Sequence, residues 1–189
     1  MSARSLLPVV LVVLVTVATP AIASNVTVSA TDLAVITNPE NAAETRTLVR
    51  FDQPEELVGA TVEFAVVEYR ASVSSSDAAG VLTMDAFPVT TEWDGDTVEW
   101  AGGWSTAGGD FDRQVHAVWT TVAGESSVVR FDVTDMVAAW VSGTSPNRGL
   151  IVRAAPGEVG AAHPAGTAGE RGAPMLTIWY TGPEQHGRR

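Results

Sequence analysis

The sequence predicts an all-β fold, a two-sheet antiparallel β-sandwich of jelly-roll type with one short helix. Apolar and polar residues alternate in about eight or nine short segments, the pattern of half-buried strands. Long loops rich in Gly, Pro and Ser separate these segments, and only one segment has apolar residues at helical spacing. Strands and helices do not alternate along the chain, which argues against a parallel α/β fold. The 189 residues, 46% of them hydrophobic, suffice for one domain with a full core.

The first half of the chain supplies most of the alternating segments. They cover residues 26–30, 33–36, 47–51, 62–69 and 81–89. The segment 62–69 is apolar on both faces for part of its length, which is typical of a strand in the centre of a sheet. A loop rich in Ser, Asp and Gly is predicted over residues 72–80.

The second half begins with a long excursion over residues 90–114 that contains three tryptophans and several glycines. Further strands are predicted at 115–119, 127–132, 150–152 and 176–180, and residues 154–174 read as a loop. The single helix is expected to begin with Thr134 as its N-cap, to bury Trp140 and to stop at Gly143. At about two turns such a helix is not stable alone, so it must dock on the sandwich.

The N-terminus has the features of a secretory signal peptide. Arg4 precedes an apolar run over residues 6–17, and Ala21-Ile22-Ala23 is a small-x-small cleavage site. We expect a signal peptide over 1–23, a β-sandwich domain over 24–182 and a flexible tail over 183–189. The apolar run is short for a membrane span, although an uncleaved N-terminal anchor is the alternative. After cleavage no membrane span is expected, and the protein is predicted to be secreted or at the cell surface.

Charge and composition restrict the partners. The chain has 22 acidic and 11 basic residues, a net charge of −11. Nucleic acids and anionic membrane surfaces require clustered positive charge, so neither is expected as a partner. An acidic polysaccharide is repelled as well, unless a local arginine cluster or bound cations intervene. The chain has no Cys, which excludes disulfides and thiolate metal sites.

No catalytic motif emerges. The three histidines are scattered, and the loop 103–107 fails the Gly-x-Ser-x-Gly pattern because it ends in Ala107. A glycosidase needs two facing carboxylates, and with 22 acids a pair can always be nominated without geometry. The sequence therefore predicts a protein that is not an enzyme, and a hydrolase is the minor alternative.

An acidic loop offers a metal site. Asp94, Asp96 and Glu99 lie close together in sequence among glycines, and carboxylate and carbonyl oxygens are the ligands that calcium prefers. The spacing matches no EF-hand loop. Two interpretations remain open: a structural calcium site, with no other cofactor expected, and a solvated acidic loop.

Tryptophan is the most informative residue type for binding, since its flat face can stack on a sugar ring. Of the six tryptophans, Trp93, Trp100 and Trp140 are predicted to be core residues. Trp119 lies on a strand, and the sequence does not decide whether its side chain faces the core or the solvent. Trp104 lies in a Gly-rich loop and is the principal ligand candidate. The polar residues near it are Asp110, Asp112 and Arg113.

Six sequence elements, in this order, resemble the DNRLRE-type β-sandwich domain, a relative of the family 96 carbohydrate-binding modules. They are Arg-Thr-Leu-Val-Arg-Phe-Asp at 46–52, Gly-Ala-Thr-Val at 59–62, the pair Trp93 and Trp100, Phe-Asp-Val-Thr followed by Trp140, Asn-Arg-Gly-Leu at 147–150, and the closing strand at 174–180. The resemblance covers about residues 30–181. It implies a secreted or cell-surface module of the kind often attached to carbohydrate-active enzymes, some of which bind polysaccharide.

Two functions follow as hypotheses. The first is a secreted, non-catalytic module that binds carbohydrate or a surface polymer by aromatic stacking. The alternative is a structural or adhesive extracellular protein with no small-molecule ligand, whose tryptophans fill the sandwich. The oligomeric state is left open.

Overall fold

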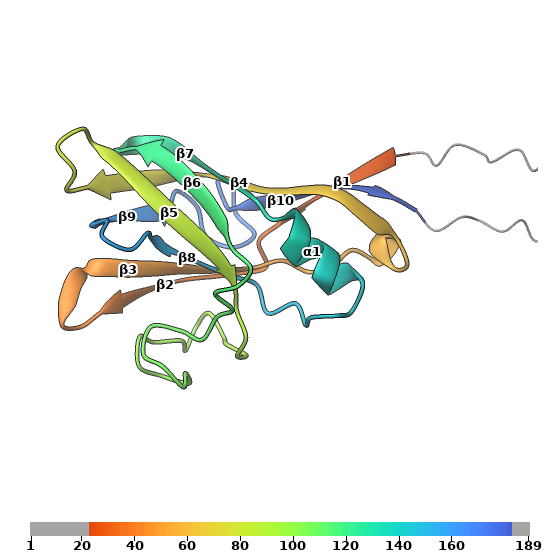
Figure 1. Cartoon of the computed structure of the whole chain (residues 1–189), viewed down its shortest axis with the longest axis horizontal. Helices are drawn as coiled ribbons and strands as arrows, with labels where there is room; N and C mark the ends of the chain where they lie inside the picture. The colour runs from red at the N-terminus through yellow and green to blue at the C-terminus, as the bar shows by residue number, and fades with distance from the viewer. Residues whose placement is uncertain (1–22, 183–189) are drawn as a thin grey trace, which may run out of the picture.

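The computed structural model describes residues 23–182, and it confirms the predicted fold class. Strands make up 51% and helices 7% of the structure. Two antiparallel five-stranded sheets pack face to face, and the single α-helix of the described residues lies against the end of the sandwich (Figure 1).

Sheet A has the order β1-β10-β4-β7, with β9 pairing the far part of β4. The bounds of its strands are β1 Ala23–Ser29, β10 Met175–Thr181, β4 Thr61–Ser75, β7 Gly124–Asp132 and β9 Gly160–Pro164. β4 is the longest strand, and it organises this sheet: β7 pairs along one edge, while β10 and then β9 share the other.

Sheet B has the order β2-β3-β8-β5-β6. Its strands are β2 Asp32–Asn38, β3 Asn41–Arg50, β8 Leu150–Ala154, β5 Val81–Pro88 and β6 Ala117–Val122. The chain crosses repeatedly between the sheets, from β3 to β4, β4 to β5, β6 to β7, and β7 through α1 to β8. This wrapping is the jelly-roll connectivity that the sequence predicts.

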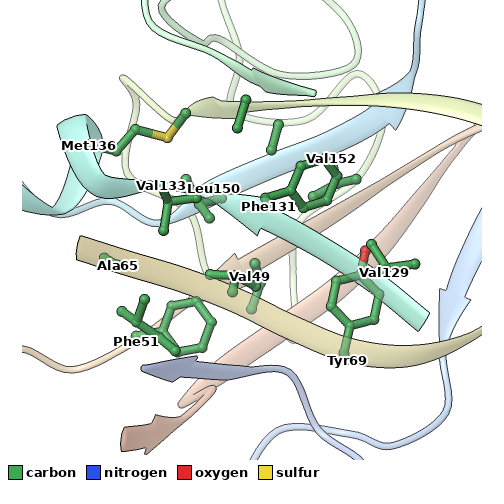
Figure 2. Packing of buried hydrophobic residues seen from close by; sticks show 14 of the residues in the cluster. Val49, Phe51, Ala65, Tyr69, Val129, Phe131, Val133, Met136, Leu150 and Val152 are labelled. Carbon is green, nitrogen blue, oxygen red and sulfur yellow. The ribbon is translucent and has the colours of Figure 1, made fainter. Parts of the chain in front are cut away.

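The main core lies between the two sheets (Figure 2). Successive side chains of a strand point to opposite faces, so alternate residues of β3, β4, β7 and β8 enter this core. Phe51, which follows β3, and Phe131 of β7 are its largest fully buried side chains. The buried residues labelled in the figure are Val49, Phe51, Ala65, Tyr69, Val129, Phe131, Val133, Met136, Leu150 and Val152.

Two segments predicted as loops are partly strand. β4 continues to Ser75 instead of ending before residue 72, and β9 lies inside the segment 154–174. The two corrections have one cause, since Val73 of β4 pairs with Ala162 of β9 and both side chains are buried. Tertiary pairing therefore overrides a local composition that is poor in strand-forming residues.

The helix α1 spans Thr134–Val141, with a 3-10 turn, η1 Glu55–Leu57, elsewhere. Trp140 is buried to 6% exposure, as predicted, and Gly143 follows the last helical turn. The predicted N-cap is wrong: Val133 is the cap residue and Thr134 is the first residue of the helix. The Thr134 hydroxyl instead accepts the Ala65 N–H at 3.0 Å and donates to Asp132 Oδ1 at 2.6 Å, which joins the helix to β4.

The predicted signal peptide lies outside the described residues except for Ala23, and the predicted tail at 183–189 lies outside them as well. Ala23 is the exposed first residue of β1. Within residues 23–182, no helix has the length and apolar character needed to span a membrane.

Candidate ligand-binding surfaces

The excursion between β5 and β6 covers the outer face of sheet B. Leu48 of β3, Phe87 of β5 and Ile151 of β8 point away from the main core and are buried in a second apolar cluster. The excursion supplies the other side of this cluster, through Trp93, Val98, Trp100, Trp104 and Phe111. It is therefore a packed third layer, visible in Figure 1 on the far side of β2 and β3 from sheet A.

Arg46 fixes the middle of this layer. It lies on the same face of β3 as Leu48, and its guanidinium carbon is 4.6 Å from the ring centroid of Trp100. Its Nη1 donates to the Gly108 carbonyl at 2.6 Å, and its Nη2 donates to Glu44 at 2.8 Å. This bond to Arg46 is the largest cause of a lowered pKa at Glu44.

Gly108 is required at this contact. Its φ of +88° lies in the left-handed region, and a Cβ atom there would come 2.7 Å from Arg46 Nη1 and 2.9 Å from the Trp100 ring.

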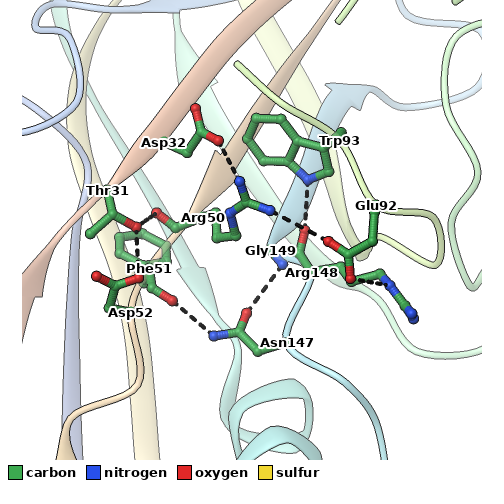
Figure 3. Close-up of polar contacts among 10 residues, drawn as sticks. All are labelled: Thr31, Asp32, Arg50, Phe51, Asp52, Glu92, Trp93, Asn147, Arg148 and Gly149. Carbon is green, nitrogen blue, oxygen red and sulfur yellow. Dashed lines mark hydrogen bonds and ion pairs between the residues drawn. The ribbon is translucent and has the colours of Figure 1, made fainter. Parts of the chain in front are cut away.

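Arg50 fixes the start of the excursion in the same way (Figure 3). Its guanidinium carbon is 4.8 Å from the Trp93 ring centroid, and its Nη2 pairs with Asp32 at 2.5 Å. Trp93 is 7% exposed, and its Nε1 donates to the Arg148 carbonyl at 2.7 Å. Both tryptophans of the pair thus serve packing.

Asp110, a predicted ligand residue, organises the excursion from within. Its carboxylate accepts the backbone N–H groups of Ser105 and Thr106 at 2.7 and 3.0 Å. It also accepts the hydroxyls of Ser105 and Thr91 at 2.7 and 2.9 Å. These bonds, the Ser105 N–H first among them, lower the pKa of Asp110. Its oxygens are used to hold the loop.

The other predicted neighbours of Trp104 lie elsewhere. Asp112 accepts the Gln114 N–H at 2.8 Å, and the exposed Arg113 lies 5.2 Å from the Phe111 ring centroid. Trp119 points toward the main core, is half-buried, and donates its Nε1 to the Val128 carbonyl at 3.1 Å. None of these residues shares a pocket with Trp104.

Trp104 itself is half-buried and donates its Nε1 to the Glu99 carbonyl at 2.9 Å. It lines an open pocket of about 490 Å³ together with Trp93. Glu92, Asp94 and Thr97 supply the polar side chains of this pocket. The polar side chains that line the pocket beside Trp104 are therefore not the predicted Asp110, Asp112 and Arg113.

The acidic residues proposed for calcium do not converge. Asp94 Oδ1 accepts the Asp96 N–H at 2.9 Å, which makes a local turn. Among residues 23–182, His, Cys, Asp and Glu side chains form no group of three or more that could hold a metal ion. Asp94, Asp96 and Glu99 are all exposed at the surface.

A broader surface lies on the outer face of sheet A, over which residues 23–182 form no covering layer like that of sheet B. Phe64 of β4 and Trp179 of β10 are cross-strand neighbours, with ring centroids 5.3 Å apart and planes tilted by 37°. Phe64 is 40% exposed and Trp179 is half-buried. A shallow groove of about 740 Å³ runs past both rings.

Charged side chains flank this groove. Glu68 of β4 pairs with Arg130 of β7, and Arg70 donates to the Ser126 carbonyl at 3.2 Å. Glu170 and Arg171 enter from the loop between β9 and β10. Three of the protein's arginines therefore line one surface of an acidic chain.

Phe64 and Trp179 are binding candidates that the sequence did not predict. Both were assigned only to alternating strands, and nothing in the alternation says which face is covered. One feature of the sequence does point to them: both faces of β4 carry apolar residues. The face that lies away from the core must therefore be covered by another segment or be available for binding.

No family model matches the chain, and no curated protein matches it. The resemblance to DNRLRE-type domains rests on the six sequence elements and stays a prediction.

Proposed function

We propose that the protein is a secreted, non-catalytic module that binds carbohydrate or another surface polymer by aromatic stacking. The observation that carries this proposal is the Phe64–Trp179 pair in the groove on the outer face of sheet A. Large apolar side chains on the solvent face of a sheet are unfavourable unless something covers them, and such patches mark interaction sites.

The groove has the chemistry that a sugar chain needs. Aromatic rings offer contact area at low entropic cost, and sheet strands hold these two rings rigidly. Glu68, Arg130 and Thr177 lie beside them and can exchange hydrogen bonds with hydroxyl groups. The groove is open at the surface, so a polymer can pass through without needing a free end.

The Trp104 pocket is a second candidate contact for the same polymer. It places an indole beside the carboxylates of Glu92 and Asp94, an arrangement that also suits hydroxyl groups. The two surfaces lie on opposite faces of the sandwich, so one short ligand cannot contact both. A comparison of Trp104 with Trp179 therefore locates the site.

The rival function is a structural or adhesive extracellular protein with no small ligand. One observation favours it: Trp93, Trp100 and Trp140 all pack internally, and the indole N–H groups of Trp104 and Trp119 are satisfied within the protein.

A binding screen decides between these functions. The secreted protein is tested on a glycan array and by polysaccharide pull-down, beside Trp179→Ala and Trp104→Ala. We expect Trp179→Ala to weaken binding at least about tenfold, or about 1.4 kcal/mol, with the fold retained. Val118→Ala, which shortens an exposed side chain on β6 of the other sheet, is the matched control. Loss of binding only in Trp104→Ala moves the site to the excursion, and the absence of binding to any glycan favours the rival.

A further inference from the structure

Strand β1 is an open edge of sheet A. All seven of its residues pair with β10 along one side, with no register shift. No other described strand pairs along its other side. The sequence Ala-Ser-Asn-Val-Thr-Val-Ser of this strand contains no charge, no Pro and no Gly. Natural proteins usually protect an edge with one of these residues or with a bulge.

The open edge leaves part of the main core exposed. Val26 and Val28 of β1 pack against this core, yet both remain half-buried. Their inward-facing partners on the neighbouring strand, Leu176 and Ile178, are 3% and 1% exposed. A further strand beside β1 would cover the two valines.

The other edges differ from β1: β2 and β7 carry charges, β9 contains Gly160 and Pro164, and β6 keeps its inward-facing Ala117 and Thr121 buried. β2 begins with Asp32 and has a register shift near its end, and β7 carries Glu125 and Asp132. The edge of β6 is uncharged, but Trp119 Nε1 and the Thr121 hydroxyl both donate to the Val128 carbonyl of β7, which ties the two edges together.

We infer that β1 pairs with β1 of a second copy of this chain, in an antiparallel arrangement that joins the two A sheets. Charge permits pairing at this edge, because copies with a large negative net charge repel one another and β1 contributes none of the 22 acidic residues. Its half-buried valines distinguish it from the uncharged edge of β6. A pairing of this kind is isologous, because the same strand is used on both copies.

In the secreted chain, which is expected to begin at Ser24, the proposed register pairs residues 24–28 of the two copies. Its two-fold axis passes through Val26, so that Asn25 of one copy lies opposite Thr27 of the other on the outer face. On the inner face, Val26 then meets Val26 of the second copy, and each Val28 lies opposite Ser24. Backbone hydrogen bonds supply the attraction, as in other cases of strand addition.

Sedimentation velocity of the secreted protein over a range of concentrations tests the inference. We expect a dimer whose population rises with concentration and also with added NaCl, because salt screens the repulsion between the acidic copies. A monomer at every concentration and salt level would overturn the inference. An interface held by salt bridges would weaken in salt, which is the opposite result.

A charge on the edge supplies the matched variants. Asn25→Lys places a cation on the exposed side of β1, where no side-chain hydrogen bond of Asn25 is lost, and it should raise the dimer dissociation constant at least about tenfold. Thr37→Lys makes the same change at an exposed position on β2, the edge of sheet B, and should leave dimerisation unchanged. Far-ultraviolet circular dichroism checks that both variants fold. The reverse ranking would place the interface on sheet B and overturn the inference.

Because the chain has no Cys, cysteine crosslinking reads the register directly. The double variant Asn25→Cys with Thr27→Cys should form a disulfide-linked dimer under mild oxidation, since the two positions face each other across the axis. Val35→Cys with Thr37→Cys, at exposed positions with the same spacing on the edge strand β2, serves as the control and should stay monomeric. Equal crosslinking of both pairs would show random collision and contradict the proposed register.

Discussion

Arg46 and Arg50 show how single residues attach a long irregular segment to a sheet. Each guanidinium lies against an indole of the excursion, and each is held by a carboxylate on its own sheet, Glu44 or Asp32. An arginine suits this position because its planar cation stacks on an aromatic face while its edge donates hydrogen bonds. The alternation Arg-x-Leu-x-Arg in β3 is therefore explained by the layer above it.

Asn147 and Gly149 solve a second local problem. Asn147 donates to the Phe51 carbonyl at 2.8 Å and accepts the Gly149 N–H at 3.1 Å (Figure 3). Gly149 has a φ of +79°, and a Cβ there would lie 2.3 Å from the Val49 carbonyl oxygen. The Asn-Arg-Gly-Leu sequence thus brings β8 against β3 where no larger residue fits.

The buried hydroxyl of Tyr69 leads to a testable prediction about a single residue. Its hydroxyl is buried without a hydrogen-bond partner among the described residues, and burial raises the pKa of the phenol. An unsatisfied buried hydroxyl costs free energy, so Tyr69→Phe should increase the free energy of unfolding by about 1–2 kcal/mol. Urea unfolding measures the change.

The chain's other tyrosine provides the control. Tyr180 is half-buried, and Tyr180→Phe should change stability by less than about 0.5 kcal/mol. A Tyr69→Phe variant that is less stable than the parent would show that the hydroxyl is hydrogen-bonded in solution.

The helix α1 offers the clearest test of how one element packs against the others. Met136, Val137 and Trp140 are buried on one side of α1, against the end of the sandwich. Trp140→Ala should reduce the free energy of unfolding by about 3–5 kcal/mol, as for other buried aromatic residues. Asp135→Ala, at an exposed position in the first turn, is the control and should cost less than about 1 kcal/mol. A loss below about 1 kcal/mol for Trp140→Ala would contradict this docking.

How well an element could be predicted depended on where its stability comes from. β3, β4 and β10 carry large apolar residues in alternation, and that pattern was sufficient to find them. β9 was not predicted because Gly-Ala-Ala-His-Pro has weak strand propensity, and the pairing of Ala162 with Val73 holds it in place. The sequence contained each partner, but only the fold brings them together.

The same reasoning applies to the candidate site. The sequence predicted that Trp93, Trp100 and Trp140 are core residues, and all three pack in the apolar clusters. The exposure of Trp179 could not be predicted, because it depends on the excursion covering sheet B and leaving sheet A open. The loop-holding role of Asp110 could not be predicted for a related reason: its bonds to Ser105 and Thr106 require the fold of the loop.

For the whole molecule, we expect export with cleavage of the predicted signal peptide. Cleavage after Ala23 removes only the first residue of β1, so residues 24–29 keep their pairing with β10. N-terminal sequencing of the secreted protein should begin at Ser24. Ala23→Leu, which places a large residue at the cleavage site, should block or displace processing. A mature chain that retains Met1 would contradict export by this route.

The first and last strands of the described domain are neighbours, and Ala23 is paired with Thr181. Both ends of the described domain thus lie at the same point of sheet A. A pulling force applied between these ends acts on the β1–β10 ladder one pair at a time, as in opening a zipper, and never loads all its hydrogen bonds together. We therefore expect a tether through both termini to yield at low force by peeling away β1, while β4 and its three partner strands hold the remaining sandwich together.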